Sequence, residues 1–216
     1  MFHSLNETHQ SKAITYKGVV FYDPIYCAFG GSINPSFMPE GLLAYAKKAP
    51  SFFVVGEAPS IPSGITIEKE VVCSQMILTQ PFDFNSYESI VPLVSKEQHK
   101  ALFDLVNLVQ PGYFKSKTAE MGRYFGIYKN NQLVAVTGER MRMNQYTEIS
   151  AIVTHPDYTG NGYAKGLIKH TTDLVFQEGK IPYLHVVKTN RPAIGLYEKL
   201  GFTHRREITF WKLKHH

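Results

Sequence analysis

A glycine-rich turn is the feature of the sequence best suited to bind a charged ligand. The run Thr159–Ala164 joins a predicted strand, Tyr146–Thr154, to a predicted helix. Gly160 and Gly162 allow a tight turn and a close approach of the backbone to a ligand. The first N–H groups of the helix lack intrahelical acceptors, and the helix dipole adds positive potential there. The turn therefore predicts a phosphate or diphosphate site, the alternative being a turn used only for packing.

Two common nucleotide-binding motifs fit this turn poorly. A P-loop requires Gly-x4-Gly-Lys-Ser/Thr, and the sequence lacks that pattern. The dinucleotide-binding pattern needs a third glycine three residues after the second, whereas Gly166 comes one residue late. The dinucleotide-binding pattern also needs an acidic residue at the end of the next strand, about 20 residues further on. The acidic residue nearest this distance, Glu178, instead precedes Gly179 in a predicted turn. A nucleotide-binding oxidoreductase therefore stays only a competing hypothesis.

The elements around the turn predict a mixed α/β fold. Ile90–Val94 is a predicted strand, after which Ser95 and Gln98 form a capping-box pattern at the start of a helix. The elements expected next are, in order, a second short helix, three strands, the turn with its helix, a strand, a helix capped by Asn190, and a last strand or hairpin. The expected later strands are Tyr124–Lys129, Gln132–Met143, Tyr146–Thr154, Tyr183–Val187 and Phe202–Leu213. This order is not a strict alternation of strands and helices.

Residues 1–89 differ from the rest in composition. They are rich in Pro, Gly, Ser and aromatic residues and carry short β-like runs. The predicted elements are strands at Gly18–Tyr22, Ser51–Val55 and Gly64–Leu78 and a short helix at Pro39–Lys48. We find no site chemistry in this region, because Cys73 in an apolar run is expected to be a core thiol.

Composition excludes several classes of protein. Hydrophobic residues make up 44% of the 216 residues, which is enough for a core, and the net charge of +5 is spread without a dense basic stripe. We therefore expect no nucleic-acid partner. Cys27 and Cys73 cannot form a disulfide framework or a zinc knuckle, so no metal is expected. The start of the chain lacks a signal-peptide pattern, and the sequence lacks a long apolar stretch, so a cytoplasmic protein without a membrane partner is expected.

Two separate motifs resemble those of the GNAT superfamily of N-acetyltransferases. Residues 154–164, with the sequence THPDYTGNGYA, resemble the acyl-CoA motif Arg/Gln-x-x-Gly-x-Gly/Ala that follows a strand and a His-Pro loop. Thr159 departs from the pattern, since a long polar or cationic side chain is common there. Residues 190–202, NRPAIGLYEKLGF, resemble the signature Asn-x-x-Ala-x-x-Leu-Tyr-x-x-x-Gly-Phe at the spacing of the family.

The resemblance covers about residues 90–216 and implies a division of the chain into two regions. Residues 90–216 would be a GNAT domain, with a central mixed sheet flanked by helices, and residues 1–89 an N-terminal α/β region of unknown role. The runs 138–141 and 148–150 look closest to the branch of glycine N-acyltransferase-like proteins. In that branch a degenerate copy of the domain precedes the catalytic half, which would account for residues 1–89.

The resemblance also implies an activity and a cofactor. The family transfers an acyl group, here expected to be acetyl, from acetyl-CoA to a primary amine of a small molecule or peptide, and no metal is required. A non-catalytic acyl-CoA-binding module is the alternative, because of Thr159 and the N-terminal half. A homodimer is left open. The acyl-CoA contacts implied are Ile152, Val153, Thr154, Thr159, Gly160, Asn161, Gly162, Tyr163, Ala164 and Asn190.

Catalytic and acceptor-binding candidates follow from the same resemblance. A carboxylate would accept the proton of the amine, and Glu148, with Glu139 as its competitor, occupies the strand position at which the family often places the base. Tyr197 would protonate the leaving thiolate. Four side chains are expected to face the acceptor: Tyr124, Arg140, Arg142 and Tyr146. An inward-facing Arg140 or Arg142 would favour an acceptor that carries a carboxylate.

Overall fold

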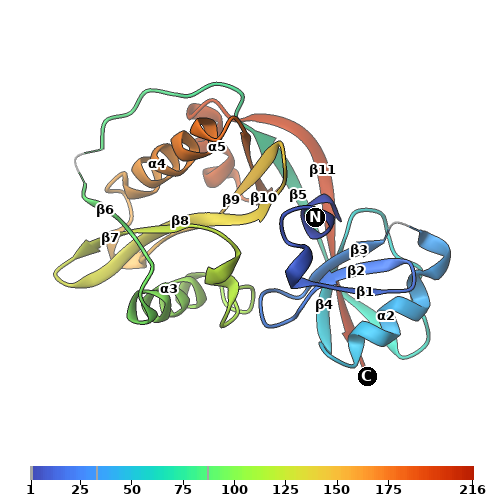
Figure 1. Cartoon of the computed structure of the whole chain (residues 1–216). Coiled ribbons are helices and arrows are strands. Elements are labelled where there is room, and N and C mark those ends of the chain that lie inside the picture. Colours follow the sequence, from blue (N-terminus) through green and yellow to red (C-terminus); the bar gives the residue numbers. More distant parts are fainter. Residues whose placement is uncertain (1, 33, 87) are drawn as a thin grey trace.

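A single curved sheet runs through the part of the chain that the computed structural model describes, residues 2–32, 34–86 and 88–216 (Figure 1). Its strand order is β1-β2-β3-β4-β11-β5-β10-β9-β8-β7-β6. The strands are β1 (Ala13–Tyr16), β2 (Val19–Tyr22), β3 (Phe29–Ser32), β4 (Ser51–Val55), β5 (Ile65–Ile77), β6 (Ile90–Pro92), β7 (Tyr124–Lys129), β8 (Gln132–Arg142), β9 (Tyr146–Thr154), β10 (Ile181–Val187) and β11 (Thr203–His215).

Helices cover both faces of the C-terminal half of the sheet. In Figure 1, α4 and α5 lie on one side of β7–β10 and α3 lies on the other. The helices are α1 (Phe2–Asn6), α2 (Met38–Ala46), α3 (Lys96–Val109), α4 (Tyr163–Gln177) and α5 (Arg191–Lys199), with 3-10 turns η1 (Gln10–Lys12), η2 (Pro35–Phe37), η3 (Thr118–Met121) and η4 (Pro156–Tyr158). Within the described ranges, none of the helices combines the length and apolarity needed to cross a membrane.

The order of elements expected for residues 90–216 is confirmed, and so is the mixed α/β fold class. Local signals set the helix starts: Ser95 accepts from the N–H of Gln98 at 3.2 Å, and the Gln98 side chain accepts from the Ser95 N–H at 2.9 Å. Asn190 Oδ1 accepts from the Ala193 N–H at 3.2 Å at the start of α5. The last element, left open as a strand or a hairpin, is one long strand, β11, with a bulge between His204 and Arg206.

The N-terminal half continues the same sheet. β1 to β4 extend one edge, and α2 connects the parallel pair β3 and β4. β5 leaves this group and lies between β10 and β11, antiparallel to both. The boundary at residue 89 stays a prediction, and the expected degenerate copy does too. The sheet is continuous across that boundary, so residues of the first 89 lie next to the C-terminal strands.

Two strands of this half, β1 and β3, were not expected from the sequence. β3 has the sequence FGGS, which is poor in strand-forming residues, and long-range packing places it. Gly30 lies against the ring of Phe21, which is fully buried and stacks on Tyr45 with centroids 4.1 Å apart. A side chain at Gly30 would overlap that ring, so the close approach of β3 to β2 requires glycine.

We predict that Gly30→Ala destabilises the fold and that Gly31→Ala does not. A Cβ at Gly30 would lie 2.0 Å from Cδ1 of Phe21, whereas a Cβ at Gly31 would meet only a carbonyl oxygen at 3.5 Å. Overpacking of this kind costs about 1–3 kcal/mol. Urea denaturation should show that loss in the free energy of unfolding for Gly30→Ala and a change within about 0.5 kcal/mol for Gly31→Ala. Equal stabilities of the two variants would contradict this packing.

Candidate active site

The site forms where two parallel strands separate. β9 and β10 pair only at their first residues, from Ile181 opposite Tyr146 to Tyr183 opposite Glu148. Beyond that point the two strands continue to Thr154 and Val187 without pairing to each other. Backbone groups along these facing edges are therefore available to a ligand that enters between the strands, much as an added strand would bind.

A β-bulge in β9 accompanies the separation. The pairing of β8 with β9 shifts register between Val136 and Gly138, which face Val153 and Ser150. Ala151 lies in this bulge with a φ of 50°, in the left-handed region that a residue with a side chain rarely adopts. Bulges redirect a strand and its side chains, and strained backbone of this kind occurs often at functional sites. The sequence gives no signal for this bulge.

A cavity of about 390 Å³ passes beside the opening and is lined from both sides of the sheet. Gln110, Tyr113 and Thr118 reach it from the segment that follows α3, and Asn190 and Tyr197 reach it from α5, which Figure 1 shows on the opposite face. Its strand residues come mainly from β8, β9 and β10: Arg140, Glu148, Ile149, Ser150, Ala151, Ile152, His185, Val186 and Val187. The cavity thus connects the two faces at the separated strands.

The glycine-rich turn lies between β9 and α4, as predicted. Gly160 and Gly162 have φ values of 81° and 76°, and a Cβ at either would meet no atom within 4 Å, so the backbone is open to solvent there. Gly162 caps α4. Thr159 Oγ1 donates to the Pro156 carbonyl at 3.2 Å, and the Asn161 side chain donates to the Tyr158 carbonyl at 2.9 Å. These side chains shape the loop by bonding to its carbonyl groups, and the backbone of Gly160 to Gly162 stays exposed.

The strand residues before the turn have different environments. Ile152 lines the cavity, the Val153 side chain is buried, and Thr154 pairs with Ala135. At the start of α4, Tyr163 is buried against Phe125, and Ala164 is half-buried. Of the predicted acyl-CoA residues, Ile152 and Asn190 therefore line the cavity, whereas the turn offers backbone groups.

A buried carboxylate forms the polar centre of the cavity. Glu148 is 1% exposed and accepts two hydrogen bonds from Arg140, Nε to Oε2 at 2.9 Å and Nη2 to Oε1 at 2.7 Å. His185 Nδ1 lies 2.7 Å from the same Oε1. Such a buried pair needs this full set of partners, because removal of one would leave an uncompensated charge. Arg140 does face the cavity as expected, but Glu148 already supplies its carboxylate.

Gln75 fixes the tautomer of His185. Gln75 Oε1 accepts from Arg205 at 3.2 Å and from Arg206 at 3.0 Å, so the amide nitrogen must face the other way. That nitrogen lies 2.9 Å from His185 Nε2 and can only donate. His185 Nε2 is therefore the acceptor, and Nδ1 carries the hydrogen that is donated to Glu148.

The charge states of these groups follow from burial and from their partners. Burial opposes ionisation of Glu148, but the Arg140 guanidinium and the hydrogen bonds from His185 and Arg140 outweigh it and hold the pKa of this carboxyl well below its usual range. Burial lowers the pKa of His185, against the opposing effect of Glu148. The polar centre thus consists of the Glu148 anion, the Arg140 cation and the neutral imidazole of His185.

Tyr197 and Tyr124 also line the cavity, as expected for a proton donor and an acceptor contact. Tyr197 is 8% exposed, and burial raises the pKa of its phenol to about 12, so the hydroxyl keeps its proton at neutral pH. Tyr124 is 3% exposed, and its hydroxyl donates to the Thr118 carbonyl at 3.5 Å.

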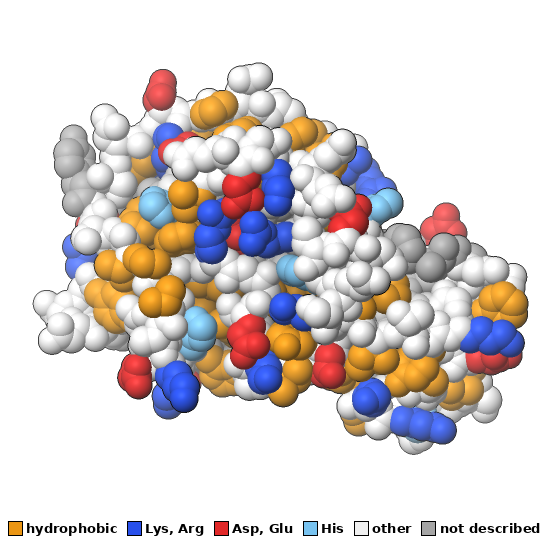
Figure 2. Space-filling view, in the orientation of Figure 1, with side chains coloured by type: hydrophobic (Ala, Val, Ile, Leu, Met, Phe, Trp, Pro, Cys, Tyr) orange, Lys and Arg blue, Asp and Glu red, His pale blue; other side chains and the backbone are white. Residues whose placement is uncertain are grey.

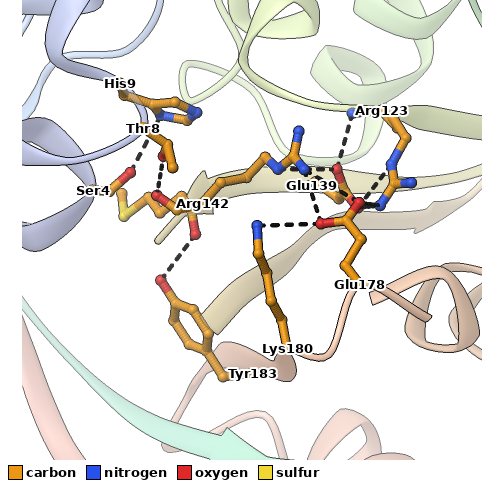
Figure 3. A network of polar contacts seen from close by, with 10 residues as sticks. Ser4, Thr8, His9, Arg123, Glu139, Arg142, Glu178, Lys180 and Tyr183 are labelled. Carbon is orange, nitrogen blue, oxygen red and sulfur yellow. Dashed lines mark hydrogen bonds and ion pairs between the residues drawn. The ribbon is translucent and has the colours of Figure 1, made fainter. Parts of the chain in front are cut away.

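Glu139, Arg142 and Tyr146 do not line this cavity. Glu139 is fully buried in a separate ion network, where it accepts from Arg123 and lies 3.7 Å from Arg142 Nε (Figure 3). Glu178 joins the network through Arg123 at 2.7 Å, Arg142 at 3.0 Å and Lys180 at 3.2 Å. Figure 2 shows mixed groups of basic and acidic side chains of this kind on the viewed face. Glu139 thus lies in an ion network away from the cavity that contains Glu148.

Tyr146 and the two arginines that bind Gln75 line a second cavity of about 460 Å³. The Arg205 guanidinium lies 5.5 Å from the centre of the Tyr146 ring. The Gln75–His185 hydrogen bond lies between this cavity and the first one, because Gln75 lines the second and His185 lines the first.

The sequence interpretation missed several residues of the site. His185 and Gln75 were not singled out, and residues 1–89 were given no site chemistry, yet β3, β4 and β5 contribute Phe29, Phe53, Val71 and Cys73 to the cavity. The signal in the sequence that could have found these two residues was a histidine and a glutamine within otherwise apolar predicted strands. Their meeting depends on β5 lying between β10 and β11, which no local pattern reveals. Among the described residues, no cluster of side chains suited to hold a metal ion was found.

Comparisons with known proteins agree with this architecture. A model of the FR47-like protein family matches residues 124–211. A solved structure from Novosphingobium aromaticivorans, assigned to the acetyltransferases of the GNAT family, superposes with a TM-score of 0.90 and 29% identity, over all of this chain and 96% of that one. A GCN5-related N-acetyltransferase from Kribbella flavida superposes with a TM-score of 0.65 and 16% identity, over 99% and 93% of the two chains, and shows the shared fold.

A curated relative also matches the C-terminal half. The [ribosomal protein bS18]-alanine N-acetyltransferase of Escherichia coli (strain K12) is 30% identical over 90 residues, which are 41% of this chain. The match spans 60% of the length of that relative. Together the comparisons support a place in the GNAT superfamily, whereas the glycine N-acyltransferase-like branch stays a prediction.

We predict that His185 remains neutral, with its hydrogen on Nδ1, below the pH at which an exposed histidine gains a proton. Its lowered pKa means that the unfolded chain takes up this proton first, so the contribution of His185 to stability is lost as the pH falls below about 6.5. Long-range ¹H–¹⁵N spectra recorded from about pH 8 to pH 5 can distinguish the tautomers and the protonated ring. An imidazolium forming at or above about pH 6.5 would refute the assignment.

Proposed function

We propose that this protein transfers the acetyl group of acetyl-CoA to a primary amine. The observation that carries the proposal is the opening between β9 and β10. The exposed glycine-rich turn follows the β9 end of this opening, and the cavity that contains Glu148 and Tyr197 lies beside it. The GNAT-family neighbour of 29% identity and the bS18-alanine N-acetyltransferase match support this choice of chemistry.

The proposed cofactor site uses backbone groups more than side chains. The amides at the start of α4 would hold the diphosphate, since they lack intrahelical acceptors, lie at the positive end of the helix dipole and follow the exposed Gly160–Gly162 turn. The free edge of β9 at Ile152 to Thr154 would accept the pantetheine arm, and a backbone N–H there would bind the thioester oxygen as it gains charge. Thr159 supplies no cation, so the backbone must provide most of the diphosphate contacts.

The reaction replaces the C–S bond of the thioester with a C–N bond, and it moves two protons: one leaves the amine and one is added to the thiolate. The neutral amine attacks the thioester carbonyl carbon, a C–N bond forms, and the C–S bond breaks to release the CoA thiolate. Tyr197 would protonate the thiolate, which its raised pKa permits because the phenol is still protonated at neutral pH. The amine must lose one proton before or after the attack.

Glu148 is the proposed acceptor of that proton, directly or through water. Its Oε2 takes only the Arg140 Nε hydrogen bond among the contacts in the structure, which leaves a lone pair for the amine side of the cavity. Its lowered pKa makes it a weak base. Most of the driving force must therefore come from acceptor molecules that are already neutral. Glu139 is disfavoured for this role by its place in the separate ion network.

We predict that the pH dependence of kcat/KM follows the acceptor and not the enzyme. Glu148 is ionised, His185 neutral and Tyr197 protonated across about pH 7 to 10, so none of the three changes state there. The rate should rise with pH up to the pKa of each amine, measured with amines of different pKa. A plateau that begins between about pH 6 and 8 for every amine would contradict this and indicate a titrating enzyme base.

We predict that Gly162→Val abolishes or strongly weakens acetyl-CoA binding, while Gly179→Val does not. Both glycines have left-handed φ values, 76° and 70°, and open space around them, and they flank opposite ends of α4. The backbone strain of about 1–3 kcal/mol should therefore be similar. Only Gly162 adjoins the first amides of α4, so its variant should raise the Kd for acetyl-CoA at least about tenfold in calorimetry.

An assay of thiol release with a panel of amines tests the transfer itself. Release that depends on both acetyl-CoA and an amine supports an enzyme. Acetyl-CoA binding without turnover over the panel would indicate a non-catalytic binding module. Stronger thermal stabilisation by NAD than by acetyl-CoA would contradict both.

A further inference from the structure

We propose that the N-terminal half completes an acceptor subsite for an aromatic group, so that the substrate is a primary amine with an uncharged aromatic body. This inference rests on the proposed transfer reaction. It gives residues 1–89, which carry no catalytic candidate, a role in choosing the substrate.

Four aromatic side chains form a continuous wall, here called the aromatic row: Tyr113, Phe53, Phe29 and Phe210, all of which line the cavity. Tyr113 and Phe53 stack with centroids 5.6 Å apart, and Phe53 and Phe29 stack at 5.1 Å. Phe210 meets Phe29 edge-on at 5.9 Å. Phe53 is already stacked by Tyr113 and Phe29, and Arg140 lies over the Phe29 ring, so a further ring would stack on Tyr113 or meet the row edge-to-face. Both geometries are favourable between aromatic rings.

The row ends at the polar centre. Phe210 meets the His185 ring edge-on at 5.3 Å, and the Arg140 guanidinium lies 5.0 Å from the centre of the Phe29 ring. An aromatic group on the row would therefore place an attached amine near Glu148, which Arg140 and His185 both contact. Phe29 and Phe53 come from β3 and β4, so this wall depends on the N-terminal strands continuing the sheet.

The charge balance of the cavity selects against other amines. Among the described residues that line it, the Lys, Arg, Asp and Glu side chains are Arg140 and Glu148 alone, and these two neutralise each other. A free amino acid would bring a carboxylate that lacks a free cation, and a polyamine would bring extra cations that lack a free carboxylate. Burial of either unpaired charge is costly. This corrects the expectation that an inward-facing Arg140 would favour an acceptor with a carboxylate.

The subsite is also placed correctly for an acceptor. Tyr113 reaches the cavity from the segment after α3, on one face of the sheet, whereas Asn190 and Tyr197 reach it from α5 on the other. The proposed thioester lies at the opening between β9 and β10, between these two sides. An amine on the aromatic row and acetyl-CoA on the α4–α5 side would therefore meet across the separated strands.

The test uses the full chain with acetyl-CoA and a panel of acceptors that differ in charge and aromaticity. The panel contains phenethylamine, phenylalaninamide, a peptide with an N-terminal phenylalanine, phenylalanine, lysine and spermidine. We expect kcat/KM to be at least about tenfold higher for the first three than for the last three. The order among the first three shows whether a small molecule or a peptide is preferred. A flat panel, or a preference for spermidine, overturns the proposal.

Variants of the row supply the structural control. Tyr113 is 42% exposed, so Tyr113→Ala should fold, and it should lower kcat/KM for aromatic amines about tenfold while the KM for acetyl-CoA stays the same. Phe103→Ala is the matched control, because Phe103 is 37% exposed on α3 and does not line the cavity. Phe53→Leu should reduce the same preference. Aromatic selectivity that survives both row variants would contradict the subsite.

Direct binding separates this inference from the proposed function. Calorimetry of phenethylamine with the acetyl-CoA-bound protein, with and without Tyr113→Ala, reports the subsite even where turnover is absent. Row-dependent binding without turnover supports the subsite and counts against the transferase. If instead the row variants alter selectivity among acyl-CoA chain lengths and leave the amines unaffected, the row holds the acyl group and the proposal is wrong.

Discussion

The separation of β9 from β10 after the Glu148–Tyr183 pair is the constraint on which the rest of the site depends. A parallel pair that opens leaves two rows of backbone donors and acceptors without strand partners, and such groups must bind water, side chains or a ligand. The left-handed residue Ala151 and the bulge around it hold β9 in this altered course. The opening also lets one cavity reach both faces of the sheet, which is what a reaction between two separate substrates requires.

A chain of side-chain hydrogen bonds crosses the sheet beside this opening. It runs from Arg140 on β8 through Glu148, His185 and Gln75 to Arg206 on β11, and these residues lie on five strands that are consecutive in the sheet. Where backbone pairing between β9 and β10 ends, this series of side-chain hydrogen bonds holds the two strands in position relative to each other. Because each donor and acceptor in it is defined, the network sets the tautomer of His185 and the ionised state of Glu148 together.

Local signals in the sequence were sufficient for the C-terminal elements and for part of the site. The capping box at Ser95, the Asn190 cap and the glycine-rich turn all depend on neighbours within a few residues, so they could be predicted. Glu148 and Tyr197 also reach the cavity. The position of β5, the bulge at Ala151 and the aromatic contacts of Phe53 could not be predicted, because they arise from strand pairing over long distances in the chain. Glu139 and Glu148 lie on neighbouring strands, but Arg123 neutralises Glu139 outside the cavity and Arg140 neutralises Glu148 inside it.

A crystal structure of the protein with acetyl-CoA tests the central claim most directly. We expect the pantetheine arm between β9 and β10, with the diphosphate on the amides that begin α4 and the thioester next to Ile152, facing the cavity that holds Glu148. A cofactor bound elsewhere, or strands that close together and leave the turn empty in that complex, would contradict it.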